Sequence, residues 1–379
     1  MLREGTYLVV TPFFPSKKSH HGTYIYDQIN EIRNQTNFNI KVIKTVSVSS
    51  LEVDYEYDGF QVFVLRNINI PFFIFPGLFN FINKSRILGL LDNQNISDVA
   101  IVHGHVTYPS AFLSNCIADK FKCKSIIQHH GLDVLQLMHG RVSLFRRLQR
   151  RYIIRKGLNE LNKIDLNIGV SNRVLAELNN FTRYNPKAQE VLYNGVDTLK
   201  FFPKKNQDIQ YYTIGCIANF YRSKDHITLI KAVHRLIQSG KKIKLKLIGS
   251  GTTLNFCKQY VDKHKISNDV YFLGYKDHTE LNSFYNSIDL FVLPSYYEAL
   301  GCVYLEAWAT QTPFIGVRSQ GISELAPIPD YMLINKKDVI SLQEKIVYFM
   351  DSDIVLEFDQ SLSIRNTIQE FLEFNIFDL

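Results

Sequence analysis

The sequence predicts an α/β protein of two doubly wound, Rossmann-like parallel-sheet domains that face each other across a cleft. Three observations support this prediction. In the second half of the chain, apolar runs of strand length alternate with segments of helical periodicity, which is typical of βαβ units. The first half repeats this alternation less regularly. Between the halves lies Tyr193–Pro203, where Asn-Gly and a proline break regular structure.

The first domain is expected over residues 1–193. Short apolar runs predict its strands at Tyr7–Val10, Ile40–Ile43, Gln61–Val64, Ala100–Val102, Ser125–Gln128 and Leu166–Val170. Helical patterns predict helices over Thr23–Arg33 and Leu144–Leu161. Strands that alternate with helices in this way form a parallel sheet covered by helices.

A hinge is expected at residues 194–204 and the second domain at 205–358. Its predicted strands are Tyr211–Ile217, Ile243–Ile248, Val270–Leu273, Leu290–Leu293, Phe314–Val317 and Tyr331–Ile334. Apolar residues at helical spacing predict a helix from Ile227 to Ile237, and Gly240 follows as its stop. The last segment, 359–379, looks helical from Ile364, and we expect it to cross back onto the first domain.

Composition narrows the class of protein. The chain has 379 residues, of which 46% are hydrophobic and 21% charged, as expected for two or three globular domains. Its five cysteines are scattered and lack CxxC spacing, which favours a reducing compartment and argues against a zinc site. The net charge of +7 suits a phosphorylated substrate or an anionic membrane surface and does not require nucleic acid. No apolar run approaches a membrane span, and the N-terminal run is too short for a signal peptide.

The segment Ser295–Glu306 is the most informative motif. It follows a predicted strand, with Glu298 in the turn and Glu306 inside the next predicted helix. Ligands of α/β sheets bind at the carboxyl ends of strands, and backbone N–H groups at a helix start favour anions such as a pyrophosphate. Two carboxylates beside an anion site suit the hydroxyl-rich parts of the same ligand. A sugar nucleotide contains both chemical groups.

Four motifs in order produce a family resemblance. They are Gly22–Tyr24, His130–Asp133, Asn194–Pro203 and the Glu-x7-Glu pair Glu298–Glu306. With them the chain resembles the retaining glycosyltransferases of family 4, which have the GT-B fold of two Rossmann-like domains. The resemblance covers essentially the whole chain.

The resemblance implies roles in binding the donor sugar nucleotide. Glu298 would hydrogen-bond the donor sugar, and Glu306 would bind the ribose hydroxyls. The backbone N–H groups of Leu300, Gly301 and Cys302 would meet the sugar and the pyrophosphate.

The resemblance also implies which residues face the diphosphate and the reacting sugar. Lys224 would neutralise the diphosphate, and Gly22 and Thr23 would approach it from the first domain. His130 would lie near the reacting side of the sugar. The chain departs from the family at Asn219, where an arginine is common, and Arg222 is the nearby residue that could replace the lost charge.

The chemistry accounts for these residue types. As the diphosphate leaves, negative charge grows on it, so a fixed cation and oriented N–H dipoles stabilise the transition state more than the ground state. Lys224 and the helix start after Gly301 would supply both, and no metal or other cofactor is then required. The only Asp-x-Asp pattern nearby, Asp351–Asp353, is interpreted as the solvated end of a helix.

Three further residues are weaker candidates for contact with the acceptor or the sugar. His103 and His105 end a predicted strand, and a structural role is as well supported as a direct one. Asp133 completes the turn that follows His130. Gly249–Gly251 is interpreted as a tight turn that could approach the nucleotide.

Two segments allow contact with a membrane. Residues 71–82 are rich in aromatic side chains, which suits either a membrane surface or an ordinary buried segment. A second segment carries arginines at helical spacing, which suits a solvated helix face, adsorption to anionic lipid or capture of a lipid diphosphate. These arginines are Arg146, Arg147, Arg150, Arg151 and Arg155.

The sequence thus predicts a hexosyltransferase that uses a nucleotide sugar, with UDP favoured over GDP. The expected acceptor is a saccharide, either free or linked to a polyprenyl diphosphate, in bacterial cell-surface polysaccharide synthesis. The expected location is the cytoplasm, at the inner face of the membrane. A sugar-nucleotide epimerase or phosphorylase on the same fold is one alternative, and a non-catalytic partner subunit that binds a sugar nucleotide is another.

Overall fold

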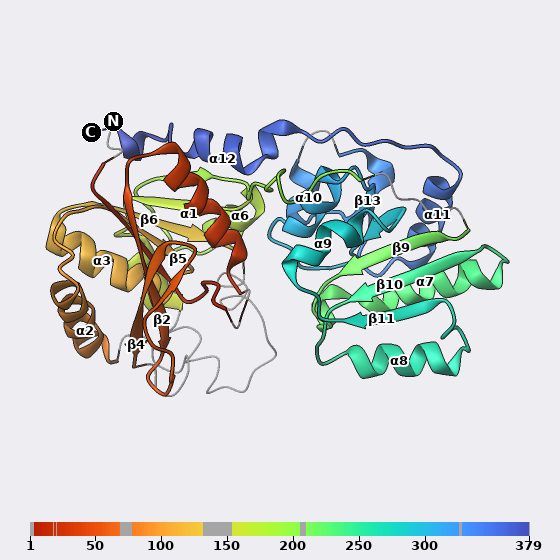
Figure 1. The fold of residues 1–379 in the computed structure, drawn as a ribbon, viewed down its shortest axis with the longest axis horizontal. Coiled ribbons are helices and arrows are strands. Elements are labelled where there is room, and N and C mark those ends of the chain that lie inside the picture. The colour runs from red at the N-terminus through yellow and green to blue at the C-terminus, as the bar shows by residue number, and fades with distance from the viewer. Residues whose placement is uncertain are drawn as a thin grey trace. The chain divides into compact units, whose positions relative to one another are not determined.

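The structure is a computed structural model that describes residues 4–17, 19, 21–68, 78–131, 154–204, 210–325 and 328–378. Four predictions fall wholly or partly outside these residues: the role of Asp133, part of the aromatic run (71–77), four of the five arginines (146, 147, 150 and 151), and the first part (144–153) of the helix predicted over Leu144–Leu161. The chain forms two compact units. Unit 1 comprises Met1–Asn194 with Ile364–Leu379, and unit 2 comprises Gly195–Ser363 (Figure 1).

Unit 1 is built on an eight-stranded sheet in the order β3-β4-β2-β1-β5-β6-β7-β8. All neighbouring strands are parallel except β3 and β4. Because β1 pairs with both β2 and β5, the strand order reverses beside β1, where ligands of such sheets usually bind. The strands are β1 (Thr6–Thr11), β2 (Asn39–Ser47), β3 (Tyr55–Tyr57), β4 (Phe60–Asn67), β5 (Val99–His105), β6 (Lys124–His129), β7 (Leu166–Gly169) and β8 (Gln189–Val191).

Helices cover both faces of this sheet because its side chains alternate between two apolar cores. Tyr7 and Val9 of β1 belong to the core under α1 (Thr23–Gln35) and α12 (Ile364–Phe371). Leu8 and Val10 point to the opposite core. That core lies under α2 (Asn80–Asn93) and α3 (Ser110–Phe121). Unit 1 also contains α6 (Asn172–Asn179) and a helical stretch at 154–161.

The C-terminal helix α12 belongs to unit 1 although it follows unit 2 in the chain. Its buried residues Ile368 and Phe371 join the core that contains Ile25 and Ile29 of α1. In Figure 1 the blue α12 accordingly lies beside the red α1. Burial of this apolar stripe holds the end of the chain on the sheet.

Unit 2 contains a six-stranded, fully parallel sheet in the order β11-β10-β9-β12-β13-β14. Its strands are β9 (Tyr212–Ile217), β10 (Ile243–Ile248), β11 (Val270–Gly274), β12 (Leu290–Val292), β13 (Phe314–Val317) and β14 (Leu333–Ile334). Its helices are α7 (His226–Gln238), α8 (Leu254–Lys263), α9 (His278–Tyr285), α10 (Cys302–Ala309) and α11 (Val339–Met350). The predicted α/β class with two parallel sheets is confirmed.

Most predicted elements agree with the structure to within a few residues. The strands Ile243–Ile248 and Phe314–Val317 match their predicted bounds. Two strands were not predicted, β3 and β8, and each has only three residues. Among the described helices, none is long and apolar enough to cross a membrane.

We expect Phe371→Ala to destabilise unit 1 by about 3–5 kcal/mol, because the side chain is fully buried between α12 and the sheet. Urea unfolding monitored by circular dichroism measures this loss. Glu373→Ala, an exposed position two residues away, is the control and should stay within about 0.5 kcal/mol of the original protein. Equal unfolding midpoints for the two variants would contradict a stabilising role for α12.

Candidate active site

In unit 2, the candidate residues gather at the carboxyl ends of β9 and β12. Lys224 lies in the 3-10 turn Arg222–Lys224 that follows β9, and Glu298 lies in the loop that follows β12. The Nζ of Lys224 donates a hydrogen bond to Oε1 of Glu298 in a close ion pair. The structure therefore brings together a cation and a carboxylate that are 74 residues apart in the sequence.

Neighbouring hydrogen bonds hold these two loops in place. The hydroxyl of Ser295 donates to the carbonyl of Ser223 at 3.0 Å, and the backbone N–H of Tyr296 donates to the same carbonyl at 3.0 Å. The backbone N–H of Glu298 donates to Oε1 of Gln320 at 2.8 Å. Glu298 is only 9% exposed, so its carboxylate has a defined position beside Lys224.

The start of α10 requires glycine at Gly301. This residue precedes the helix with a φ of 88°, and a Cβ there would lie 2.7 Å from the ring of Tyr304. The helix begins at Cys302, next to the buried Leu300, and the N–H groups of a first helical turn lack partners within the helix. The turn from Glu298 to Cys302 thus combines a carboxylate with N–H groups that favour an anion.

Glu306 lies one turn inside α10 and is also nearly buried. Its Oε2 accepts a hydrogen bond of 2.8 Å from the hydroxyl of Tyr285, and its Oε1 lies 3.6 Å from Nε2 of His278. Burial, and then the charge of Glu306, raise the pKa of Tyr285 well above its ordinary value, so the hydroxyl remains a donor. Sequence reasoning missed Tyr285, His278 and Gln320, because no local motif marks them.

Asn219 and Arg222 are both exposed on the loop after β9, near Lys224. This loop rests on the Gly249–Gly251 turn: a Cβ on Gly249 would lie 2.0 Å from the carbonyl oxygen of Ala218. The backbone N–H of Phe220 also donates to the carbonyl of Ser250 at 2.8 Å. The predicted tight turn therefore supports the loop that carries the cations.

Beneath the same loop, the ring of Phe220 stacks on His226 with centroids 3.9 Å apart. Burial lowers the pKa of His226 to about 4. The imidazole is therefore neutral near pH 7 and adds no charge to the group of cations above it.

In unit 1, Gly22 and Thr23 form the entry to α1. Gly22 has a φ of 90°, and a Cβ there would lie 2.5 Å from the carbonyl oxygen of Phe13. Only glycine fits this close approach. Thr23 is the first residue of the helix, so the predicted phosphate-approaching pair does lie at a helix N-terminus.

The three candidate histidines of unit 1 lie in one column. His103 and His105 project from the same face of β5, with ring centroids 4.4 Å apart. Nδ1 of His105 lies 3.0 Å from Nε2 of His130, and the ring of Tyr24 lies 4.7 Å from that of His130. His103 and His105 have no exposed surface, which gives them no direct route to a ligand in this structure.

Within the described ranges, no cluster of three or more histidine, cysteine or acidic residues has the arrangement of a metal site.

Two family models match the chain, one in each half. The model "Glycosyltransferase Family 4" matches residues 22–200, and the model "Glycosyl transferases group 1" matches residues 197–366. Together they extend over both units described above.

Individual relatives are similar over shorter stretches. Glycogen synthase of Mycobacterium tuberculosis is 36% identical over 135 residues, covering 35% of this chain and 33% of that protein. The lipopolysaccharide core biosynthesis glycosyltransferase LpsE of Rhizobium meliloti is 35% identical over 105 residues, covering 28% and 29%. The matched stretches thus span about a third of these curated relatives.

Solved structures resemble the whole chain. Anabaena Alr3699/HepE in complex with UDP and glucose superimposes with a TM-score of 0.71, at 14% identity, covering 99% of this chain and 100% of that one. This likeness shows the fold. With the two family models that span the sequence, it establishes that the chain belongs to glycosyltransferase family 4 and has the GT-B fold.

Proposed function

We propose that this protein transfers a hexose, with retention of configuration, from a nucleotide-diphosphate sugar to a saccharide acceptor. The Lys224–Glu298 pair at the start of α10 is the observation that carries the proposal. It sets a cation for phosphate and a carboxylate for sugar hydroxyls side by side. Glu306, in the same helix, offers a second carboxylate for the ribose.

The donor we infer is a UDP-sugar. Alr3699/HepE, which shares the fold, has been solved with UDP and with UDP-glucose. In this chain the diphosphate would lie against Lys224 and the N–H groups of Gly301 and Cys302. Arg222 would supply the positive charge that the family's arginine provides at the position of Asn219. The hydroxyl groups of the ribose would donate hydrogen bonds to the carboxylate of Glu306.

The same groups explain how the bond to the sugar would break. Negative charge grows on the departing diphosphate. Lys224 and the N–H groups of the first turn of α10 would stabilise this charge, because they already have fixed positions and need not reorient during the reaction. Glu298 orients the sugar through its hydroxyls. We assign Gly22, Thr23 and His130 of unit 1 to the phosphates and the reacting side of the sugar, as the family resemblance implies.

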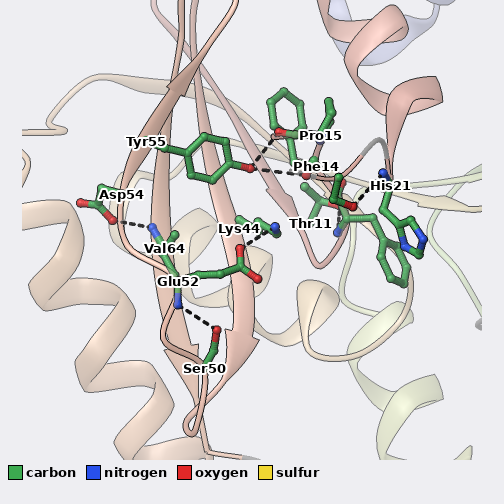
Figure 2. A network of polar contacts seen from close by, with 12 residues as sticks. Thr11, Phe14, Pro15, His21, Lys44, Ser50, Glu52, Asp54, Tyr55 and Val64 are labelled. Atoms are coloured by element: carbon green, nitrogen blue, oxygen red, sulfur yellow. Dashed lines mark hydrogen bonds and ion pairs between the residues drawn. The ribbon is translucent and has the colours of Figure 1, made fainter. Parts of the chain in front are cut away.

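For the acceptor we propose a cavity of about 1110 Å³ in unit 1, between the loop after β1 and the segment from β2 to β3. Its walls include the ion pair of Lys44 and Glu52, whose Nζ and Oε2 atoms are 2.6 Å apart. Figure 2 shows this pair beside Tyr55, whose hydroxyl donates to the carbonyl of Pro15 at 3.0 Å and so ties the two walls together.

This cavity suits a saccharide. The ammonium and carboxylate groups of the pair can donate to and accept from neighbouring hydroxyls, and Phe13 and Tyr55 add apolar ring surface. His21 also lines the cavity and precedes Gly22, so a bound acceptor would lie next to the turn assigned to the donor phosphates.

The similarity to LpsE supports a role in bacterial surface polysaccharide synthesis. The choice of a lipid-linked acceptor at the membrane depends on segments 71–77 and 146–151, which lie outside the described residues. It therefore stays a prediction of the sequence.

Substitutions of Glu306 and Glu298 should have different effects, the first on UDP affinity and the second on the rate of sugar transfer. Glu306→Gln should weaken UDP binding by about 10-fold to 100-fold, because a hydrogen bond to a charged group contributes about 1.5–3 kcal/mol. Glu298→Gln should leave UDP affinity unchanged and lower the rate of sugar transfer about 100-fold. Calorimetry with UDP and assays of UDP release from UDP-glucose measure the two effects. Equal UDP affinity in both variants would remove the ribose role of Glu306.

Incubation with donor alone tests the reaction class. A transferase should release UDP slowly from UDP-glucose without an acceptor and faster when a saccharide acceptor is supplied. Formation of an epimeric UDP-sugar in the absence of acceptor, followed by NMR, would instead establish an epimerase.

The acceptor cavity can be tested with Lys44→Met/Glu52→Gln, which removes both charges together and leaves no buried charge unpaired. Transfer to a panel of methyl hexosides should show a KM for the saccharide raised at least about 10-fold, the equivalent of one or more lost hydrogen bonds. UDP affinity should not change. Lys41→Met, at a half-buried position that does not line the cavity, is the control, and an unaltered KM in the double variant would place the acceptor elsewhere.

A further inference from the structure

One cavity of unit 2 is lined by four positively charged side chains. It has a volume of about 770 Å³ and lies where the second half of α7 meets the segment that leads into α11. Two of its cations, Lys231 and Arg235, project from α7 one turn apart, and the other two, Lys336 and Lys337, precede α11. We call this the basic cavity. Its volume is in the range of pockets that hold small organic molecules.

The four cations of the basic cavity have no direct ionic partner. Across residues 210–325 and 328–378, none of them forms an ion pair with a carboxylate. Elsewhere in unit 2 such pairs do form: Nζ of Lys244 lies 2.9 Å from Oδ1 of Asp269, and Nζ of Lys276 lies 2.6 Å from Oε1 of Glu280. Like charges around one hollow repel each other, and a bound anion would be attracted by all of them.

Two carboxylates lie near the basic cavity, but they do not balance its charge. Asp338 lines it, and its Oδ1 already accepts the backbone N–H of Ser341 at 2.9 Å as the N-cap of α11. Burial raises the pKa of Asp225 and outweighs the opposite effect of Lys337 and Lys231. The cavity therefore keeps an excess of positive charge.

The rest of the lining adds ring surface and uncharged donors. Nζ of Lys231 lies 6.0 Å from the ring centroid of Tyr260, and the hydroxyl of Tyr260 lies 3.1 Å from Nδ1 of His234. Burial lowers the pKa of His234, so this imidazole is neutral near pH 7. Val339 and Ile340 begin the twelve-residue helix α11, and the N–H groups of a first helical turn favour an anion.

We propose that the basic cavity binds a small molecule that carries phosphate groups. Phosphate oxygens accept charge-assisted hydrogen bonds from ammonium and guanidinium groups, and the planar guanidinium of Arg235 can donate two to one phosphate. A phosphate ester has close to two negative charges at pH 7, which matches the excess positive charge of the cavity better than a single carboxylate does.

The basic cavity is separate from the proposed donor site. Lys224, Glu298 and Glu306 are not part of its lining. The two places are neighbours through Lys337, because its Nζ lies 5.5 Å from the ring centroid of Tyr296, in the loop after β12. A molecule in the basic cavity would therefore leave the donor site free, and its binding does not depend on the proposed function.

Calorimetry with inorganic diphosphate and with fructose bisphosphate tests this site in the whole chain, with UDP present to fill the donor site. Lys231→Gln/Arg235→Gln should weaken the binding of these probes about 100-fold, because each lost hydrogen bond between charged groups corresponds to about tenfold. Both side chains are exposed on α7, so the fold should tolerate the changes.

The matched control is Lys258→Gln/Lys263→Gln, which removes the same charge from exposed positions of α8 outside the basic cavity. It should change the affinity less than about 2-fold at about 0.15 M salt, where distant charges are screened. Tighter binding of fructose bisphosphate would identify an organic phosphate as the ligand, and tighter binding of diphosphate an inorganic one. Three results would overturn the proposal: equal weakening in both double variants, unchanged affinity in Lys231→Gln/Arg235→Gln, or no binding of either probe.

Discussion

The ion pair of Lys224 and Glu298 is the contact on which the proposed donor site depends. It joins the loop after β9 to the loop after β12, two neighbouring strands of the sheet whose carboxyl ends meet at one edge. Lys224 compensates the carboxylate of Glu298, which lies in a nearly buried position where an unpaired carboxylate would be costly. The pair therefore both stabilises the local structure and presents the two kinds of group that a nucleotide sugar requires.

The charged pair of unit 2 contrasts with the buried, uncharged His103 and His105 of unit 1. Its histidine column is buried under α1 and α12, and burial lowers the pKa of His103 to about 3. Neutral rings are compatible with an apolar core, yet each still has a direction because one nitrogen donates and the other accepts.

The fold was largely predictable because its strands are local apolar runs. Phe314–Val317 is buried on both faces of a parallel sheet, and its sequence is accordingly free of polar side chains. Ile243–Ile248 instead alternates buried apolar residues with two half-buried lysines, which is the period of a strand. The strand Tyr55–Tyr57 was not predicted, because it has only three residues, with an exposed Glu56 at its centre, and so short a segment shows no clear alternation of apolar and polar residues. Glu298, Gly301 and Glu306 could be selected because a single strand–turn–helix segment contains them all.

The sequence by itself determined the strand–helix alternation and the motifs at strand ends, because both depend on residues near one another in the chain. Only the tertiary structure decided that Tyr285 meets Glu306 and that Tyr7 meets His103, pairs separated by 21 and 96 residues. It also decided that His103 and His105 are buried, since Phe371 of the returning C-terminal helix packs near His103. Such contacts arise when apolar faces from distant segments cover a common sheet, and no spacing within a single segment encodes them.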